Sequence, residues 1–257
     1  MCRSDNSRDN RYRASIYVEG KDGEKILVDA GPEIRLQAVR AGITRIDAVL
    51  LTHSHADHLH GIDDLRPLTF ENPIPVYANK LTYNDLFKRF SYIWAEHTQK
   101  GGGLPHLNPI LVDKHILREG FSIGAVHIMP IPVMHGELKI LGWKFNENGK
   151  CAVYITDVSK VPYSSYLKAR NCQVLIVDAL RIQPHATHFS FDEALDFTKK
   201  IYRSQEGSKM LREVYLTHIC HNHSHKEIEY YCRAWMSRNN IKNLTVSPAY
   251  DTMSIEL

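Results

Sequence analysis

The sequence is constrained most by one stretch, His53-Ser54-His55-Ala56-Asp57-His58, which follows the apolar run at 48–51. Imidazole and carboxylate groups are ligands for zinc and other divalent metals, and such a cluster is costly to desolvate without metal or water. Side chains alternate along a strand, so His53, His55 and Asp57 could share one side. A helix beginning near Asp57 would turn Asp57 and His58 toward a second position. We therefore expect this loop to feed two adjacent metals; the alternative is a polar loop that happens to be rich in histidine.

Polar side chains also follow other apolar runs that we expect to be strands, at Asp29, His135, Asp157 and His218. The carboxyl ends of strands in layered α/β structures meet at one edge, so these side chains should converge. Two metals about 3.5–4 Å apart can share a water, lower its pKa and stabilise both the attacking and the leaving oxygens. The expected ligand sets are His53, His55 and His135 for one metal, Asp57, His58 and His218 for the second, and Asp157 as the bridge.

The composition is that of an ordinary soluble globular protein. The chain has 257 residues, 43% hydrophobic and 24% charged, with a net charge of +3, and we expect a single domain over residues 1–257. This charge makes no case for a nucleic-acid partner. No run reaches the length of a membrane span, and residues 1–13 lack the apolar segment of a signal peptide. Five cysteines without a CxxC pair favour a reducing, cytoplasmic location.

Along the chain, hydrophobic periodicity predicts strands and hairpins interleaved with helices. Residues 91–113 are the least regular part. The expected strands include 14–18 and 25–29 as a hairpin, 174–177 ending at Asp178, and 253–257; the expected helices include 32–41 ended by Gly42, 59–65, 81–90, and 191–202 capped by Ser190.

Several motifs in their order along the chain resemble the metallo-β-lactamase superfamily: HSHADH after LLT, then MHG, YITD and LTH. The resemblance covers nearly the whole chain. It implies an α+β fold, the four-layer αββα sandwich with a dinuclear site between the sheets, and it implies that Asp29 braces the site from behind the ligands. Further stretches are similar to the PhnP-like cyclic phosphodiesterase group: DHLHGIDDLRPL, FSYIW with GGG, VDALR, HATHFS, LTHICH and PAYDTMSIEL.

The PhnP-like resemblance also implies catalytic roles. In that group the histidine matching His188 is thought to act as a general acid near the leaving group or to contact the substrate. Imidazole titrates near neutrality, so it can donate a proton at pH 7; the alternative for His188 is an ordinary surface histidine. Asp57 is expected to be needed for turnover. His60, His223 and His225 flank the ligands and are expected to be solvated.

The same group carries a structural zinc, and here only Cys2 and His221 match its ligands. The rest of that motif is missing, along with the usual first strand and its Gly-rich loop. Two ligands are too few for a closed structural zinc site, so any such site would be vestigial.

The expected function is a metal-dependent hydrolase, most simply a phosphodiesterase that uses a hydroxide held by two metals. Zinc or manganese is expected, and iron or nickel also fits nitrogen and oxygen ligands. The expected substrate is a small phosphodiester, not a nucleic acid or a membrane component, and a homodimer is one alternative for the assembly. The rival functions are a glyoxalase II-like thioester or lactone hydrolase, a tRNA 3′-end nuclease, and a non-enzymatic metal-binding module.

The incomplete structural site gives a first prediction. Cys2 and His221 should bind zinc weakly or not at all, so purified protein should hold no third metal at stoichiometric level. Elemental analysis checks this. A third equivalent that disappears in a Cys2→Ala variant would contradict it.

Overall fold

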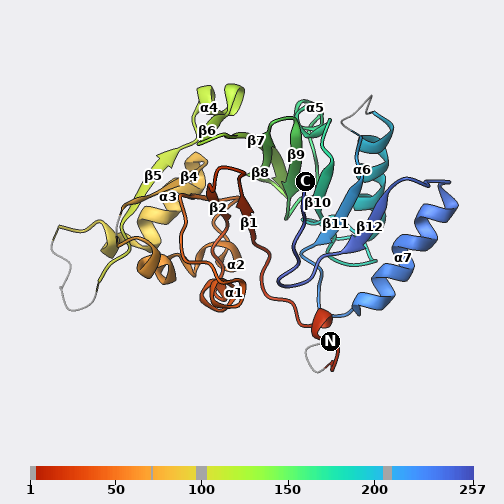
Figure 1. Ribbon diagram of the computed structural model, residues 1–257, viewed down its shortest axis with the longest axis horizontal. Coiled ribbons are helices and arrows are strands. Elements are labelled where there is room, and N and C mark those ends of the chain that lie inside the picture. The colour runs from red at the N-terminus through yellow and green to blue at the C-terminus, as the bar shows by residue number, and fades with distance from the viewer. Residues whose placement is uncertain (1–3, 71, 97–102, 205–209) are drawn as a thin grey trace. The chain divides into compact units, whose positions relative to one another are not determined.

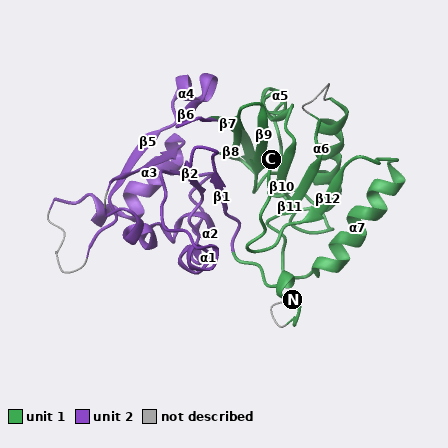
Figure 2. Ribbon diagram, viewed as in Figure 1, with its two compact units in different colours: residues 1–12, 128–257 green, residues 13–127 purple. Residues whose placement is uncertain are grey.

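A computed structural model describes residues 4–70, 72–96, 103–204 and 210–257. The chain divides into two compact units (Figure 2). Unit 1 comprises residues 1–12 and 128–257, and unit 2 comprises residues 13–127. The single domain expected over residues 1–257 stays a prediction, and each unit is described by itself.

Unit 2 is built on a five-stranded sheet (Figure 1). Across the sheet the strands are β1 (Ile16–Glu19), β2 (Lys25–Val28), β3 (Ala48–Leu50), β4 (Ile74–Ala78) and β5 (Leu107–Leu111). β1 and β2 form the expected antiparallel hairpin, and β2 to β5 run parallel. The carboxyl ends of β2 and β3 therefore share one edge, where Asp29 and the loop at His53 follow them.

The helices between these strands are α1 (Ile34–Ala41), α2 (Ala56–Leu59), the 3-10 turn η2 (Ile62–Leu68), α3 (Lys80–Arg89) and the 3-10 turn η3 (Ser91–Ile93). A further helix, α4 (Lys114–Glu119), follows β5. α1 ends at Gly42, which has φ 66°, as predicted. The helix expected over 59–65 is wrong in its bounds. The chain instead forms α2 and η2, because the Gly61 N–H donates to the Ala30 carbonyl (2.8 Å) and leaves the helical pattern.

Two glycines bring the end of β2 close to α2. The Ala30 N–H donates to the His58 carbonyl at 2.8 Å, which fastens α2 to the segment after β2. A Cβ on Gly61 would lie 2.0 Å from the Gly31 carbonyl oxygen, and a Cβ on Gly31 would lie 2.2 Å from the Asp57 carbonyl oxygen. Only glycine allows backbones to approach this closely. The backbone of the predicted ligand loop is therefore held by packing as well as by hydrogen bonds.

Unit 1 is built on the second sheet. Its strands are β7 (Val126–His135, entering the unit at Ile128), β8 (Leu138–Glu147), β9 (Lys150–Ile155), β10 (Val174–Asp178), β11 (Glu213–Thr217) and β12 (Thr245–Pro248), in that order across the sheet. β8 and β9 are an antiparallel hairpin that turns at Asn148 and Gly149, both with positive φ. β9 to β12 run parallel. The carboxyl ends of β9, β10 and β11 thus share an edge.

Three helices of unit 1 contribute to its apolar core: α5 (Tyr163–Ala169), α6 (Phe191–Arg203) and α7 (His225–Arg238). A short 3-10 turn, η1 (Ser7–Asp9), precedes the first strand of the chain. Ser190 caps α6 as predicted, in a capping box with Glu193. The described residues contain no helix with the length and apolar character needed to cross a bilayer.

Two parts of the chain differ from expectation. Residues 91–113 contain β5, and α4 and β6 (Phe121–Ile123) follow. β5 includes Pro109, which an edge strand tolerates because one side of its backbone has no partner strand. The strand expected over 253–257 is wrong: this segment has no regular structure in the part of the chain described.

The close approach of Gly61 to Gly31 gives a prediction about stability. Gly61→Ala should lower the free energy of unfolding by about 1–3 kcal/mol, because the new methyl group meets backbone that cannot move aside. Urea denaturation measures this. Gly103→Ala is the control, because its Cβ would make only van der Waals contacts with the side chains of Arg66 (3.4 Å) and Phe70 (3.6 Å). Equal losses for both variants would contradict the packing argument.

Candidate metal centre

Three of the predicted site residues have unusual backbone conformations. Asp29 follows β2, Asp157 follows β9 and His218 follows β11, with φ of 62°, 54° and 56°. Left-handed backbone costs a residue with a side chain roughly 1–2 kcal/mol, although aspartate and histidine adopt it more often than most. Strain of this kind gathers at functional sites. Here it lies at the strand ends that carry two predicted ligands, Asp157 and His218, and Asp29, which is expected to brace the site.

In unit 2, the hexapeptide begins after β3 and ends in α2. His53 and His58 are buried, and the ring centroid of His53 lies 4.5 Å from that of His55 and 4.4 Å from that of His58. The His58 Nε2 lies 3.5 Å from an Asp57 oxygen. A ligand atom of His53 and one of His55 lie within 4.8 Å of each other. Within the loop, His53 thus lies near His55 and Asp57 lies near His58, which are the pairs that the sequence analysis assigns to separate metals.

Asp29 organises the imidazoles of this loop. It is fully buried, and its carboxylate accepts the Thr52 N–H (2.8 Å), the Thr52 hydroxyl (2.8 Å) and the His58 Nδ1–H (2.8 Å). Since the Thr52 hydroxyl gives its proton to Asp29, it accepts from the His53 Nδ1, 3.0 Å away. Burial raises the pKa of Asp29, and His58 and Thr52 oppose that rise. One carboxylate thus fixes which nitrogen two imidazoles present.

Helix α3 holds the loop from a second direction. The Ser54 hydroxyl donates to the Asp85 carboxylate, and the Arg89 guanidinium donates to the Ser54 carbonyl. Arg89 also pairs with Asp85 at 3.6 Å, one turn earlier on the same helix. The backbone between His53 and His55 is therefore anchored to α3.

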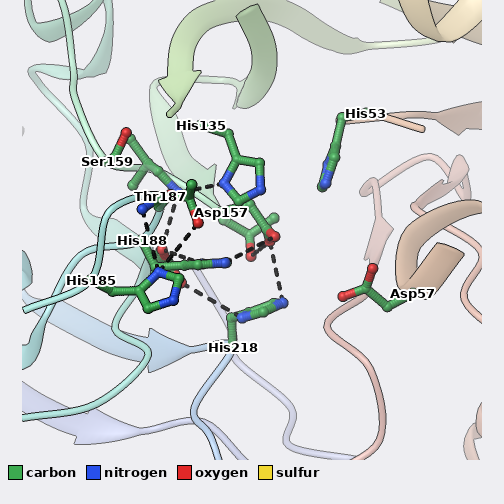
Figure 3. A network of polar contacts seen from close by, with 12 residues as sticks. His53, Asp57, His135, Asp157, Ser159, His185, Thr187, His188 and His218 are labelled. Carbon is green, nitrogen blue, oxygen red and sulfur yellow. Dashed lines mark hydrogen bonds and ion pairs between the residues drawn. The ribbon is translucent and has the colours of Figure 1, made fainter. Parts of the chain in front are cut away.

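In unit 1, Asp157 lies among the predicted histidines (Figure 3). Its Oδ1 lies 3.4 Å from the His218 Nε2 and its Oδ2 lies 3.9 Å from the His188 Nε2. His135 ends β7, and its Nδ1–H donates to the Thr187 carbonyl at 2.8 Å. Both oxygens of Asp157 therefore face imidazole nitrogens, one from the predicted ligand His218 and one from His188.

His188 lies in the loop between β10 and α6 and is 9% exposed, which argues against an ordinary surface histidine. Its ring lies 4.7 Å from that of His135 and stacks on that of His218 at 4.9 Å. Its Nδ1 lies 3.1 Å from an oxygen of Asp178. The Nδ1 of His188 therefore faces Asp178, and its Nε2 faces Asp157.

The sequence interpretation missed Asp178 as a site residue. It is fully buried at the end of β10, and burial raises its pKa, as does the nearby Asp157, while His188 and His218 oppose the rise. The sequence contained the information to find it, because Asp178 directly follows a run of apolar residues, as Asp29 does. Only the strand was inferred there.

The donor chemistry fits divalent metals. His53, His58 and His135 each have Nδ1 engaged, by a hydroxyl, a carboxylate and a carbonyl respectively, so each presents the Nε2 lone pair. Metal-binding histidines characteristically donate their other ring N–H in this way. Neutral imidazoles and carboxylates suit zinc, manganese, iron or nickel.

The structural zinc site predicted from the sequence involves Cys2 and His221. Cys2 lies outside the described residues, and His221 lies in an exposed turn, so the vestigial zinc site stays a prediction.

His225 was expected to be solvated, and this prediction is wrong. It is 4% exposed, because its backbone N–H donates to the buried Asp9 carboxylate (2.6 Å) and its Nε2 lies 3.3 Å from Glu229. His60 is exposed as expected, and His223 is half-buried.

Comparisons with known proteins agree with this chemistry. Residues 24–219 match the model of the beta-lactamase superfamily domain. A crystal structure described as a new diphosphatase from the PhnP family has 32% sequence identity and a TM-score of 0.79, and the match covers 100% of this chain and 88% of that one.

Two curated relatives are longer proteins. An octanoyltransferase of Porphyromonas gingivalis (strain ATCC BAA-308 / W83) is 32% identical over 197 residues, which are 76% of this chain and 38% of that protein. A ribonuclease Z of Clostridioides difficile (strain 630) is 23% identical over 189 residues, 68% of this chain and 57% of that protein. This chain therefore spans only part of these relatives, whose named activities belong to the whole proteins. The matched family and the α+β fold, together with the histidine and aspartate clusters of both units, place this chain in the metallo-β-lactamase superfamily, where it is similar to the PhnP family.

Proposed function

We propose that this protein is a phosphodiesterase that works with two divalent metals. A hydrolase is supported by the superfamily and by relatives named as a diphosphatase and a ribonuclease. The phosphodiester substrate is our inference from the PhnP-like similarity and from the ligand chemistry.

The observation that carries the proposal is the shared orientation of the buried imidazoles. Each described Nδ1 contact of His53, His58 and His135 leaves Nε2 as the donor atom. Bound metals would supply an activated water and stabilise charge on the phosphoryl oxygens. We propose the ligand sets His53, His55 and His135 for one metal and Asp57, His58 and His218 for the other, with Asp157 shared.

The chain's own residues supply the proton transfer. His188 is held by Asp178 through its Nδ1–H, so Nε2 is the nitrogen that would take up a proton and, in the imidazolium form, give it to the departing oxygen. Asp29 would keep His53 and His58 in the metal-binding tautomer. Each of these roles follows from which nitrogen of the ring is already engaged.

The proposed substrate is a small phosphodiester. Zinc or manganese is the proposed metal, with iron or nickel as alternatives. Cysteines scattered along the sequence without a CxxC pair support the proposal of a reducing, cytoplasmic compartment.

Metal analysis followed by a substrate panel tests the function. We expect about two metal equivalents per chain, and turnover of cyclic and linear phosphodiesters above that of S-lactoylglutathione and of a tRNA precursor. Faster hydrolysis of the thioester would favour the glyoxalase II-like rival. Faster cleavage of the tRNA precursor would favour the nuclease, and metal binding without turnover of any substrate would favour the binding module.

Loss of a ligand gives a quantitative prediction. Asp57→Ala should lower the metal content below two equivalents and reduce turnover of bis(4-nitrophenyl) phosphate by about 10³-fold or more, because metal loss removes several kcal/mol of charge stabilisation. The unfolding transition should persist. Asp64→Ala, an exposed carboxylate of η2, is the matched control and should change neither quantity. Full activity of Asp57→Ala would exclude the mechanism.

The role of His188 is tested by leaving groups. His188→Gln should slow phosphodiesters with alkoxide leaving groups by about 10²–10⁴-fold, because these need a proton to depart. Esters of 4-nitrophenol should be affected far less, because nitrophenolate leaves without one. Rates are compared at full metal occupancy. A uniform loss across both ester types would show that His188 acts in some other way.

A further inference from the structure

The hydrogen bonds of the buried Asp178 carboxylate with described residues all fall on one of its two oxygens. One oxygen, Oδ2, accepts the backbone N–H of Val158 (3.0 Å), the backbone N–H of Phe189 (3.2 Å) and the Nδ1–H of His188 (3.1 Å). Backbone amides can only donate, so this oxygen must be an acceptor. The His188 ring therefore donates from Nδ1 and keeps a lone pair on Nε2.

The second oxygen faces another ring. Oδ1 of Asp178 lies 3.9 Å from the Nδ1 of His218, and it makes no hydrogen bond with any described residue. One ligand atom from each of Asp178, His188 and His218 lies within 4.8 Å of the others. The other nitrogen of His218, Nε2, lies 3.4 Å from Asp157. The two nitrogens of His218 thus face two different carboxylates.

We propose that Asp178 is a positioning residue that holds both His188 and His218 in the Nδ1–H tautomer, so that both present Nε2. It would do in unit 1 what Asp29 does in unit 2, where one buried carboxylate fixes His58 directly and His53 through Thr52. The positioning role stands on geometry alone, and only its consequence for turnover rests on the proposed function. His218 would be held for metal binding and His188 for proton transfer.

The substitution Asp178→Asn separates the effect of Asp178 on His188 from its effect on His218. The N–H groups of Val158 and Phe189 require an oxygen at the Oδ2 position, so the new NH₂ group must take the Oδ1 position. There it would donate to the His218 Nδ1 and favour the tautomer with Nε2–H, which cannot bind a metal. His188 would keep its acceptor. The substitution should therefore disturb His218 and spare His188.

Long-range ¹H–¹⁵N spectra of the metal-free protein read the tautomers directly. They are recorded above the ordinary imidazole pKa of about 6.5, so that the rings are neutral. In the unsubstituted protein, both His188 and His218 should carry the proton on Nδ1. In Asp178→Asn, His188 should be unchanged and His218 should move to Nε2–H. In Asp178→Ala, both rings should lose their preference.

Metal binding and turnover report the consequence. Asp178→Asn should weaken one of the two metal equivalents by about 10–100-fold in a chelator competition, the usual effect of losing the partner of a ligating histidine. Asp9→Asn is the control, because Asp9 is also a buried carboxylate of unit 1 but contacts His225 and Ser4 instead. It should leave metal affinity and both tautomers unchanged.

The outcomes are distinct. Nε2–H on either His188 or His218 in the unsubstituted protein would overturn the proposal without any variant, as would an unchanged His218 in both Asp178 variants. If the tautomers respond as expected but no phosphodiester is hydrolysed, the positioning role stands and the proposed function fails. If hydrolysis is found but the tautomers do not respond, the proposed function stands alone.

Discussion

Hydrogen bonds donated by the Nδ1–H groups of buried imidazoles are the interactions on which the candidate site depends. An imidazole offers two nearly equivalent nitrogens, and a metal can use only the one that carries the lone pair. The Thr187 carbonyl settles this for His135, and Asp29 settles it for His58 and, through Thr52, for His53. Without these contacts the same side chains would be divided among tautomers, and metal binding would have to select one of them.

The carboxylates that provide this control are themselves expensive to bury. An ionised carboxyl group away from water is tolerated only when donors surround it. Asp29 and Asp178 each meet that condition with backbone N–H groups and an imidazole. Both stand at the end of a buried strand, where they accept backbone N–H groups from segments that follow neighbouring strands, Thr52 after β3 and Val158 after β9. The strand ends therefore provide the solvation as well as the position of these groups.

Much of the site could be predicted from the sequence because its signals are local. The hexapeptide His53–His58 contains four of the predicted ligands within six residues. Asp157 and His218 follow apolar strands, and the parallel pairing of these strands brings their carboxyl ends to one edge of the sheet. Asp178 gave the same local signal, but its importance depends on His188, which meets it only through the fold. Likewise the burial of His225 depends on Asp9, which lies 216 residues earlier in the chain.

The errors in the fold have the same origin. β5 contains Asn108 and Pro109, residues that disfavour strands, yet pairing with β4 stabilises it at the sheet edge. Residues 253–257 have strand-like composition but no neighbouring strand to pair with in the described chain. The strand propensity of a segment predicted its structure only where a neighbouring strand was, or was not, available in agreement with that propensity. At β5 and at residues 253–257 the neighbouring strand, or its absence in the described chain, determined the structure instead.

The left-handed backbone at Asp29, Asp157 and His218 limits how such a site can change during evolution. Asparagine and glycine enter this conformation easily, whereas β-branched residues do so only with severe strain. A single substitution from aspartate to asparagine or glycine would then keep the chain folded while removing the charge that the chemistry needs. Proteins that descend from this fold, lose catalysis and keep the fold for binding should therefore carry asparagine or glycine at these strand ends more often than valine, isoleucine or threonine.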